Sequence, residues 1–449
     1  MEKSKEVVID AVKKSPYDKV KLAVCDIDGV LRGKIMHRDK FLHTLESDFG
    51  FCDVVFGWDA ADVSYENSSY TGWHTGYPDA KAVIDYTTFR KIPWENDLPF
   101  FLADFNGLGV CPRSLLKQVL SKAEKMGFKP LFSQEFEWFN FKETPQSLQE
   151  KEFKNIAPIT PGMFGYSMLR ASYGSAYFND LFDLLGKFDI PLEGLHTETG
   201  PGVFEAAITY SDILEAADRA VLFKSAVKEI AYKHDIIATF IAKYNSQLPG
   251  CSGHVHQSLW DKENKKNLFY DTDKTNNISE LMEQYMAGQL FCLPDILPMI
   301  APTINSYKRL VEGAWAPTTI TWGVDNRTTG LRALPGSHKA ARLETRICGS
   351  DVNPYLAMAA CLSAGLFGIE NKLNLEIPAT QGNGYEVKEN GILSGSLKEA
   401  TERMKKSDLA IKLFGKQFTS HFIKTREWEC RQFNLEVTDW ELKRYLEII

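Results

Sequence analysis

Several features of secreted and nucleic-acid-binding proteins are missing from this sequence. Its eight cysteines are scattered and form no C-x-x-C pair, which is typical of reduced thiols in a cytoplasmic protein rather than of a disulfide framework. No lysine- and arginine-rich run occurs, and the net charge is -7. We therefore expect a cytoplasmic protein with no nucleic-acid partner.

Long apolar segments are also missing. The residues after Met1 are polar and include no apolar core of a signal peptide. The longest apolar run, 355–369, is too short and too rich in Ala, Ser and Gly to span a bilayer. Because Asn353-Pro354 suits a helix N-cap and first turn, we expect a buried helix here and no membrane association.

The length predicts two domains. A chain of 449 residues is too long for one ordinary core, so we expect a small domain at 18–105 and a large one at 106–449. Strands are predicted in the small domain at 20–24, 54–58, 82–86 and 100–105. Helices are predicted in the large domain at 112–126, 212–234, 279–291, 354–368, 397–426 and 438–447.

Glutamates and histidines recur two residues apart in strand-like segments. Alternation along a strand places Glu135 with Glu137, and His254 with His256, on one face of a sheet. In the stretch 342–346, Arg342 and Arg346 flank Glu344 in the same way. Taken singly, such a pair of acids is usually two exposed residues, so the interpretation depends on their combination.

A tight loop adds two more acids to this set. Glu198 and Glu205 bracket Thr-Gly-Pro-Gly-Val-Phe, which can bring both carboxylates to one point. Five carboxylates cannot share a half-buried site as bare anions, because repulsion and desolvation would neutralise them. Two divalent cations would balance the charge, and oxygen ligands with one imidazole favour Mg²⁺ or Mn²⁺ over Zn²⁺. His196, just before the loop, is either a packed polar residue or a partner of a metal ligand.

Basic residues are concentrated close to Glu344 in the sequence. Five arginines fall between positions 309 and 346, together with Lys308 and Lys339. Metal ions combined with several arginines are what phosphoryl transfer requires, since the protein contributes positioning and charge neutralisation. Arginine also binds carboxylates through two parallel hydrogen bonds, so some of these residues suit an amino-acid substrate.

Seven motifs occur in one order along the chain: Glu135-Phe-Glu137, Glu198-x6-Glu205, Gly253-His-Val-His-Gln-Ser-Leu-Trp260, Asn305-Ser-Tyr-Lys-Arg309, Asn326-Arg327, Lys339-Ala-Ala-Arg-Leu-Glu-Thr-Arg346 and Asn353-Pro-Tyr-Leu356. Together they resemble the glutamine synthetase family over nearly the whole chain. The resemblance implies an α+β protein with a small β-grasp-like N-terminal domain. The large catalytic domain would be a curved antiparallel sheet flanked by helices. It also implies a ring, usually two stacked hexamers, with active sites between neighbouring subunits.

The resemblance also implies residue roles. Two metal-binding sets are expected: Glu137, Glu198 and Glu205 for one ion, and Glu135, His254 and Glu344 for the ion nearer the ATP phosphates. The expected glutamate-binding residues are Gly250, Arg309 and Arg346. The expected phosphate and nucleotide contacts are Ser258, Arg327, Arg332, Lys339 and Arg342. The implied reaction is phosphorylation of the glutamate γ-carboxylate by ATP, followed by attack of a nitrogen nucleophile on γ-glutamyl phosphate.

Two positions depart from family members that use ammonia. Those enzymes carry a glutamate that helps to deprotonate ammonium, and Trp315, which accepts no proton, stands in its place. The ammonium-pocket motif Asp-Gly-Ser-Ser, supplied by the neighbouring subunit, is here Asp59-Ala-Ala-Asp62; Tyr166 matches another member of that pocket. An added acid and an indole suit an organic ammonium, so we expect a polyamine, ethanolamine, alkylamine or arylamine as the nitrogen donor.

Three alternatives remain. The chain could use ammonia, or it could be a non-catalytic ring-forming relative, although such a protein should have lost metal ligands and all six are present. The third alternative rests on Asp26-Ile-Asp28-Gly29, which resembles the nucleophile motif of haloacid-dehalogenase-type phosphatases. The paired-aspartate motif of those enzymes is missing, and the structural interpretation is a hairpin turn at Asp28-Gly29.

Overall fold

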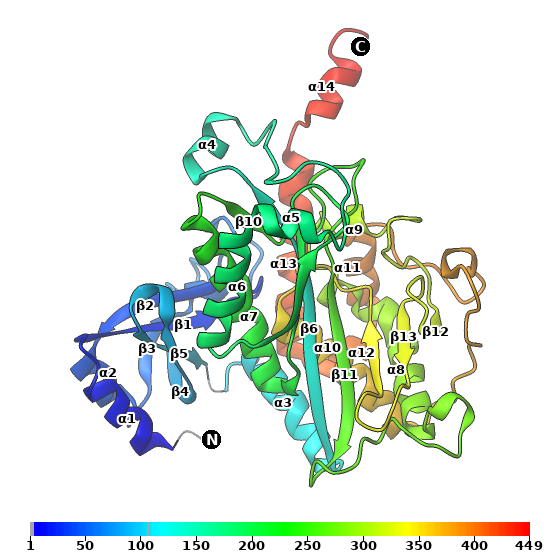
Figure 1. Ribbon diagram of the computed structural model, residues 1–449, viewed down its shortest axis with the longest axis horizontal. Coiled ribbons are helices and arrows are strands. Elements are labelled where there is room, and N and C mark those ends of the chain that lie inside the picture. Colours follow the sequence, from blue (N-terminus) through cyan, green and yellow to red (C-terminus); the bar gives the residue numbers. More distant parts are fainter. Residues whose placement is uncertain (1–3, 106) are drawn as a thin grey trace.

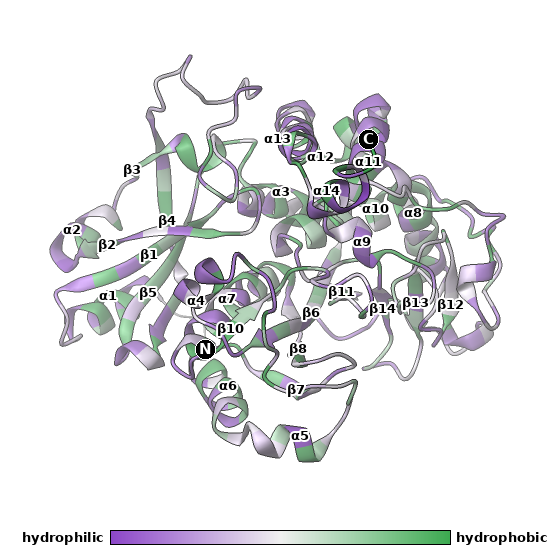
Figure 2. Cartoon of the chain, turned by 90° about the horizontal axis from the view of Figure 1, so that it is seen from above, coloured by the Kyte–Doolittle hydropathy of each residue, from purple (hydrophilic) through white to green (hydrophobic). Residues whose placement is uncertain are grey.

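Two β-sheets organise residues 4–105 and 107–449, the part of the chain that the computed structural model describes. The N-terminal sheet has the order β2-β1-β5-β4-β3, with β1 parallel to β5 and the other pairs antiparallel. It lies at one end of the molecule, opposite β12 and β13, in both views (Figures 1 and 2). Its strands are β1 (Lys19–Cys25), β2 (Leu31–His37), β3 (Phe49–Cys52), β4 (Asp79–Ile92) and β5 (Leu98–Asp104).

The predicted strand at 54–58 is wrong. The segment Asp53–Phe56 is a 3₁₀-helix, and its consecutive side chains Val55 and Phe56 are both buried. A strand would turn one of the two away from the N-terminal core, because successive side chains alternate between faces. The predicted strands at 20–24, 82–86 and 100–105 are confirmed within a residue as parts of β1, β4 and β5.

The Asp28-Gly29 turn between β1 and β2 is confirmed as a structural feature. The Asp26 carboxylate accepts hydrogen bonds from the backbone N–H groups of Asp28 and Val30. Gly29 has φ +83°, and a Cβ there would lie 3.0 Å from the Cα of Asn353. Both aspartates of this motif therefore belong to a turn packed against the second half of the chain.

The second sheet is antiparallel except for the β12–β13 pair, and β6 runs through its centre. Helices α3, α7 and α10 contact β6; Phe136 and Trp138 on β6 pack on Phe223 of α7. The strands are β6 (Phe128–Phe141), β7 (Leu192–Thr197), β8 (Val203–Ile208), β9 (Ser211–Asp212), β10 (Ile237–Thr239), β11 (Gly253–Asp261), β12 (Trp322–Val324), β13 (Leu331–Leu334) and β14 (Arg342–Thr345). The predicted α+β class, with a curved antiparallel sheet flanked by helices, is confirmed.

Five predicted helices, at 112–126, 212–234, 279–291, 354–368 and 438–447, are confirmed with ends that differ by up to five residues, whereas six of the helices in the described residues were not predicted. The helices are α1 (Lys5–Lys13), α2 (Arg38–Thr44), α3 (Pro112–Lys125), α4 (Pro145–Glu150), α5 (Met168–Tyr173), α6 (Ser175–Lys187), α7 (Ile213–Tyr232), α8 (Glu280–Ile296), α9 (Ser306–Arg309), α10 (Pro354–Glu370), α11 (Leu397–Lys406), α12 (Asp408–Phe414), α13 (Lys416–Leu435) and α14 (Asp439–Tyr445). Helix α14 extends away from the rest of the chain (Figure 1). In the described ranges, none of these helices has both the length and the apolar character needed to cross a bilayer.

The single helix predicted at 397–426 is wrong, because the segment forms three helices. Ser407 ends α11 and caps α12, with its hydroxyl accepting from the Leu409 N–H. Gly415 then adopts φ +79° between α12 and α13. A serine that caps and a left-handed glycine each interrupt helical backbone, whereas the apolar spacing runs on across both breaks.

A buried ionic network joins the N-terminal sheet to the helices of the second half. The guanidinium of Arg113 on α3 binds both oxygens of Asp218 on α7, at 2.9 and 2.8 Å, and also Asp85 at 2.8 Å and Asp104 at 2.6 Å. The Tyr355 hydroxyl donates to Asp218 at 2.6 Å. Three carboxylates therefore depend on one arginine, with Lys117 as a more exposed second partner of Asp104.

We predict that Arg113→Met destabilises the protein by roughly 3–5 kcal/mol, since it leaves buried carboxylates without their cation. Urea unfolding followed by circular dichroism measures the change. Lys117→Met is the matched control; its ammonium is more exposed, and the expected loss is below about 1 kcal/mol. Equal losses in the two variants would contradict this account of the junction.

Candidate active site

Strand register brings polar side chains from six strands to one face of the second sheet. The side chains of residues that lie directly opposite each other in antiparallel strands are close together. The cross-strand pairs are Glu135 with His254, Glu344 with His256, Arg332 with Glu344, Glu137 with Glu205, and His196 with Glu205. The two-residue spacing seen in the sequence therefore places acids and cations together.

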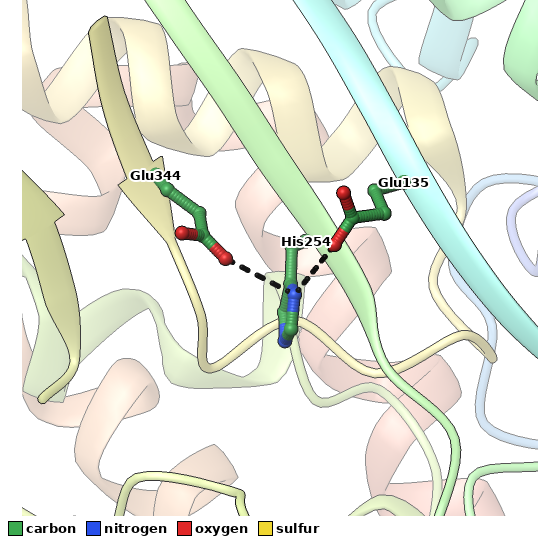
Figure 3. A group of neighbouring side chains, drawn as sticks. All are labelled: Glu135, His254 and Glu344. Atoms are coloured by element: carbon green, nitrogen blue, oxygen red, sulfur yellow. Dashed lines mark hydrogen bonds and ion pairs between the residues drawn. The ribbon is translucent and has the colours of Figure 1, made fainter. Parts of the chain in front are cut away.

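The first cluster contains Glu135, His254 and Glu344, whose side chains point toward one another from β6, β11 and β14 (Figure 3). The His254 Nδ1 lies 3.4 Å from a Glu135 oxygen and 3.2 Å from a Glu344 oxygen. Around an octahedral ion with ligands at about 2.1 Å, neighbouring ligand atoms are about 3.0 Å apart. The three side chains therefore fit a small divalent cation.

Glu344 is fully buried and surrounded by cationic groups. Arg332 donates to one carboxylate oxygen at 2.8 Å, and Arg346 donates to the other. Burial would raise the pKa of Glu344, but the hydrogen bond from His254 and the charges of His256 and Arg346 hold its pKa well below the ordinary value. Glu344 is therefore an anion in this setting.

The second cluster contains His196, Glu198 and Glu205. The His196 Nε2 lies 3.0 Å from Glu205, and its Nδ1 lies 3.8 Å from Glu198. Burial, together with the nearby charges of Glu135 and Glu137, raises the pKa of Glu205 to about 8. A carboxyl group that resists ionisation beside other carboxylates fits a position that a cation would occupy.

Glu137 lies between the second cluster and the glycine loop before β11. It is opposite Glu205 in the β6–β8 register, and one of its oxygens accepts the Ser252 N–H at 2.7 Å. The structure thus brings Glu198 and Glu205 together and sets Glu137 beside them. The third member of the compact cluster is His196, a position for which the sequence left two interpretations open.

Tyr166 covers the second cluster. Its ring stacks on the His196 ring with centroids 4.4 Å apart, and its N–H donates to the Thr197 carbonyl at 2.7 Å. The residue adopts φ +55° and remains largely exposed. Burial and the nearby charges of Glu205 and Glu198 raise the pKa of the Tyr166 hydroxyl. A left-handed backbone at a tyrosine places an aromatic hydroxyl at the rim of the acidic site.

A cavity of about 310 Å³ opens beside the first cluster. Three of the residues expected to contact the nucleotide line it, namely Ser258, Lys339 and Arg342, along with Glu135 and His256. Arg342 Nε donates to His256 Nδ1 at 3.3 Å. Of the other two expected residues, Arg332 instead binds Glu344 and Asp325, and Arg327 is not among the residues that line the cavity. The cavity is therefore lined by cationic side chains, which suit phosphate groups, and it reaches Glu135 of the first cluster.

The residues expected to bind glutamate gather at the end of β14. A Cβ at Gly250 would lie 2.3 Å from the Ala242 carbonyl and 2.9 Å from Arg309, so only glycine fits there. The buried Arg309 guanidinium donates to the carbonyls of Arg346 and Ile347. Arg346 in turn donates from Nε to the Arg327 carbonyl at 3.0 Å. These contacts link the two arginines to the loop that carries Arg327.

Asp59 and Asp62 belong to a different environment. Asp59 accepts hydrogen bonds from the N–H groups of Ala61 and Val63 and from the Trp428 indole. Asp62 forms an ion pair with Arg32 at 2.6 Å. In the described part of the chain, no hydrogen bond or ion pair joins either aspartate to the two acidic clusters.

Trp315 is exposed on the segment between α9 and β12. Its side chain is 59% exposed and its backbone has φ +57°, a conformation that a tryptophan rarely adopts. The indole has no atom that accepts a proton. The strained backbone presents an apolar surface at a position free to meet a substrate or another subunit.

Two residues of the site had no role assigned to them from sequence. Asp325 holds Arg332 through two hydrogen bonds, and His256 joins Arg342 to Glu135. The alternation in His254-Val-His256 was a signal for the second histidine. No local signal marks Asp325, which lies seven residues before Arg332 in a loop.

The chain is similar to known proteins over nearly its whole length. The glutamine synthetase catalytic-domain family matches residues 109–445. Type-1 glutamine synthetase 2 of Dictyostelium discoideum is 51% identical, over 99% of this chain and 87% of that protein. A glutamate–isopropylamine ligase of a Pseudomonas species is 38% identical, over 98% of both chains. The solved complex of the protein GmaS with ADP superposes with a TM-score of 0.84 at 26% identity, over 98% of this chain and 99% of that one.

We predict that Glu344→Gln weakens binding of Mn²⁺ by about tenfold or more, since it removes an anionic ligand from the first cluster. Isothermal titration calorimetry on the purified protein measures the affinity. Glu193→Gln is the matched control, because Glu193 lines the neighbouring cavity without belonging to either cluster. A Glu344→Gln protein that binds Mn²⁺ as tightly as the Glu193→Gln protein would rule out this cluster as an ion site.

Proposed function

Because the chain belongs to the glutamine synthetase family of carbon–nitrogen ligases, we propose that it joins L-glutamate to an organic amine rather than to ammonia. ATP drives the reaction through γ-glutamyl phosphate. The observation that carries the choice of amine is Trp315, an exposed indole at the sequence position where the ammonia-using enzymes have a proton-accepting glutamate.

The family uses ATP and divalent metal ions. We assign one ion to Glu135, His254 and Glu344, and the other to Glu198, Glu205 and Glu137, with Mg²⁺ or Mn²⁺ as the ions; the donor chemistry of both clusters supports this. When bound, such ions screen the negative charge of phosphate and carboxylate groups that must approach each other.

In the first half of the reaction, the glutamate γ-carboxylate attacks the γ-phosphorus of ATP and ADP leaves. Arg342, Lys339 and Ser258 line the cavity that we assign to the nucleotide, and Arg332, held by Glu344, faces the same side of the sheet. Arg346 and Arg309 would neutralise the carboxylates of glutamate. Fixed guanidinium groups suit this step because they need little reorganisation while negative charge shifts between the transferred phosphoryl group and the departing ADP.

In the second half, the amine nitrogen attacks the γ-carbonyl carbon and phosphate leaves. The amine must reach this carbon uncharged, so its ammonium form has to lose a proton near the acidic groups. We assign the approach to the rim formed by Tyr166 and the second cluster, with Trp315 covering the organic part of the amine and Arg327 beside the departing phosphate. Stacking of an ammonium or alkyl group on an aromatic face is favourable where water is excluded.

We further propose a ring of subunits in which Asp59 of one subunit serves the acidic site of its neighbour. The lack of contacts between Asp59 and the acidic clusters of its own chain, within the described residues, supports this arrangement. A use of ammonia is the second candidate function, and the 51% identity to a type-1 glutamine synthetase favours it.

The test is a panel of nitrogen donors assayed by phosphate release with purified protein, L-glutamate, ATP and Mg²⁺ or Mn²⁺. We expect kcat/KM for at least one alkylamine, ethanolamine or arylamine to exceed that for ammonium by about tenfold or more. A higher kcat/KM for ammonium than for every organic amine would reject the proposal in favour of glutamine synthesis. An absence of turnover with every donor would reject a ligase of either kind.

The same panel with Trp315→Glu tests the residue that carries the proposal. A carboxylate at this position can accept a proton from ammonium, so we expect ammonium use to rise relative to organic amines. Trp315→Phe is the matched control because it keeps an apolar ring and adds no base. An unchanged ratio in Trp315→Glu would remove Trp315 from the amine site.

A further inference from the structure

We infer that the hydroxyl of Tyr385 binds a carboxylate of L-glutamate, which adds a residue to the glutamate site that the sequence motifs do not include. This inference rests on the proposed function. Tyr385 lies on the connection between α10 and α11, in the 3₁₀-helix Gly384–Glu386. Its side chain is only 9% exposed, and its hydroxyl is buried without a hydrogen-bond partner among the described residues.

The polar groups that act most strongly on this hydroxyl are donors and cations. Burial raises the pKa of the Tyr385 hydroxyl, whereas the charges of Arg346 and Arg309 and the N–H groups of Trp315 and Ala316 act in the opposite direction. The hydroxyl therefore lies near both arginines that we assign to glutamate and near the segment that carries Trp315. Its oxygen faces positive groups, and its proton has no acceptor within the described part of the chain.

Hydrogen bonds hold the backbone beside Tyr385 against the loop that carries Arg327. The Gly384 N–H donates to the Thr328 hydroxyl at 2.8 Å, and the Gly384 carbonyl accepts from the Thr319 hydroxyl at 2.8 Å. A Cβ at Gly384 would lie 2.6 Å from the Thr328 carbonyl oxygen, so this close approach requires glycine. The position of the tyrosine beside this loop is therefore fixed by its neighbour in the chain.

The same connection is joined to the backbone that follows Trp315. The Ile320 N–H donates to the Gly391 carbonyl at 3.0 Å, and the Leu393 N–H donates to the Thr318 carbonyl at 2.9 Å. Because Thr318 closely follows Trp315 in the sequence, these contacts limit how far the tryptophan segment can move. The location of the hydroxyl between the two segments is therefore a property of the fold.

Arg346 also has a donor without a protein partner. Its Nε donates to the Arg327 carbonyl and its Nη1 donates to Glu344, which leaves Nη2 without an acceptor among the described residues. A carboxylate accepts several hydrogen bonds through its two oxygens. A ligand carboxylate beside Tyr385 and Arg346 would accept the hydroxyl proton and would remove the cost of a buried hydroxyl without a partner.

A glutamate carboxylate suits this position better than a phosphate of the nucleotide. Neither Tyr385 nor Arg346 is among the residues that line the cavity assigned to the nucleotide, which has its own cations in Lys339 and Arg342. The structure thus offers two separate groups of donors for anions. The group around Tyr385 is the one that contains the arginines expected to bind the amino acid.

The test is Tyr385→Phe, which removes the hydroxyl and keeps the ring. Isothermal titration calorimetry in the presence of Mn²⁺ measures the Kd for L-glutamate and for ADP. We expect the Kd for L-glutamate to rise about tenfold, the effect of one hydrogen bond to a charged group, and the Kd for ADP to stay within about twofold of wild type. Tyr86→Phe is the matched control because Tyr86 packs on the core of the N-terminal sheet; it should leave both values unchanged.

Thermal unfolding separates a binding role from a structural one. Because a buried hydroxyl without a partner costs stability, we expect Tyr385→Phe to unfold at the wild-type Tm or about 1 °C above it. A tyrosine whose hydroxyl holds the fold together would lower the Tm when it is replaced. A clear fall in Tm, or a variant that does not fold, would therefore overturn the inference.

The binding data also separate the inference from the proposed function. An unchanged Kd for L-glutamate in Tyr385→Phe would overturn the inference and leave the proposed function in place. An equal rise in the Kd for ADP would overturn it too, since the hydroxyl would then serve a phosphate as much as a carboxylate. A wild-type protein that does not bind L-glutamate would overturn the proposed function, and the inference with it.

Discussion

The buried charge of Glu344 connects the fold to the candidate active site. Its carboxylate is contacted by Arg332 from β13, by Arg346 from its own strand and by His254 from β11. A carboxylate taken fully out of water is tolerated only with such partners. The first cluster therefore depends on the register of β14. A shift of this strand by one residue would point Glu344 to the opposite face of the sheet, toward the helices and away from its cationic partners.

The sequence was enough to predict which polar side chains share a face of a sheet, because side chains alternate along a strand. The spacing of Glu135 and Glu137, and of His254 and His256, correctly indicated shared faces, and five of the six helices predicted in the large domain are present. Sequence failed where contacts join distant segments or where local packing overrides a pattern. Arg32 and Asp62 are thirty residues apart with no motif between them, and the two breaks near 407 and 415 depend on a cap and on one backbone angle.

The two halves of the proposed reaction depend on different parts of the chain. Most side chains of the acidic clusters and of the cavity beside them come from hydrogen-bonded strands of the second sheet, whereas Glu198 and Lys339 lie in loops next to it. The residues that we propose to serve the amine, Asp59 and Trp315, lie on connecting segments outside the strands. Loops on a fixed scaffold can change without disturbing it, which gives a physical reason why a glutamine synthetase and a glutamate–isopropylamine ligase are both similar to this chain over nearly its whole length.

The central claim is that the γ-carboxylate of glutamate is activated by phosphorylation before an organic amine attacks it. The most direct measurement uses L-glutamate labelled with ¹⁸O in both γ-carboxylate oxygens, with ATP and a monoamine, and mass spectrometry of the released phosphate. When the amine displaces phosphate from γ-glutamyl phosphate, the bridging oxygen leaves with the phosphorus. We therefore predict one ¹⁸O atom in each phosphate formed together with γ-glutamyl amide. Unlabelled phosphate accompanying amide formation would contradict the account.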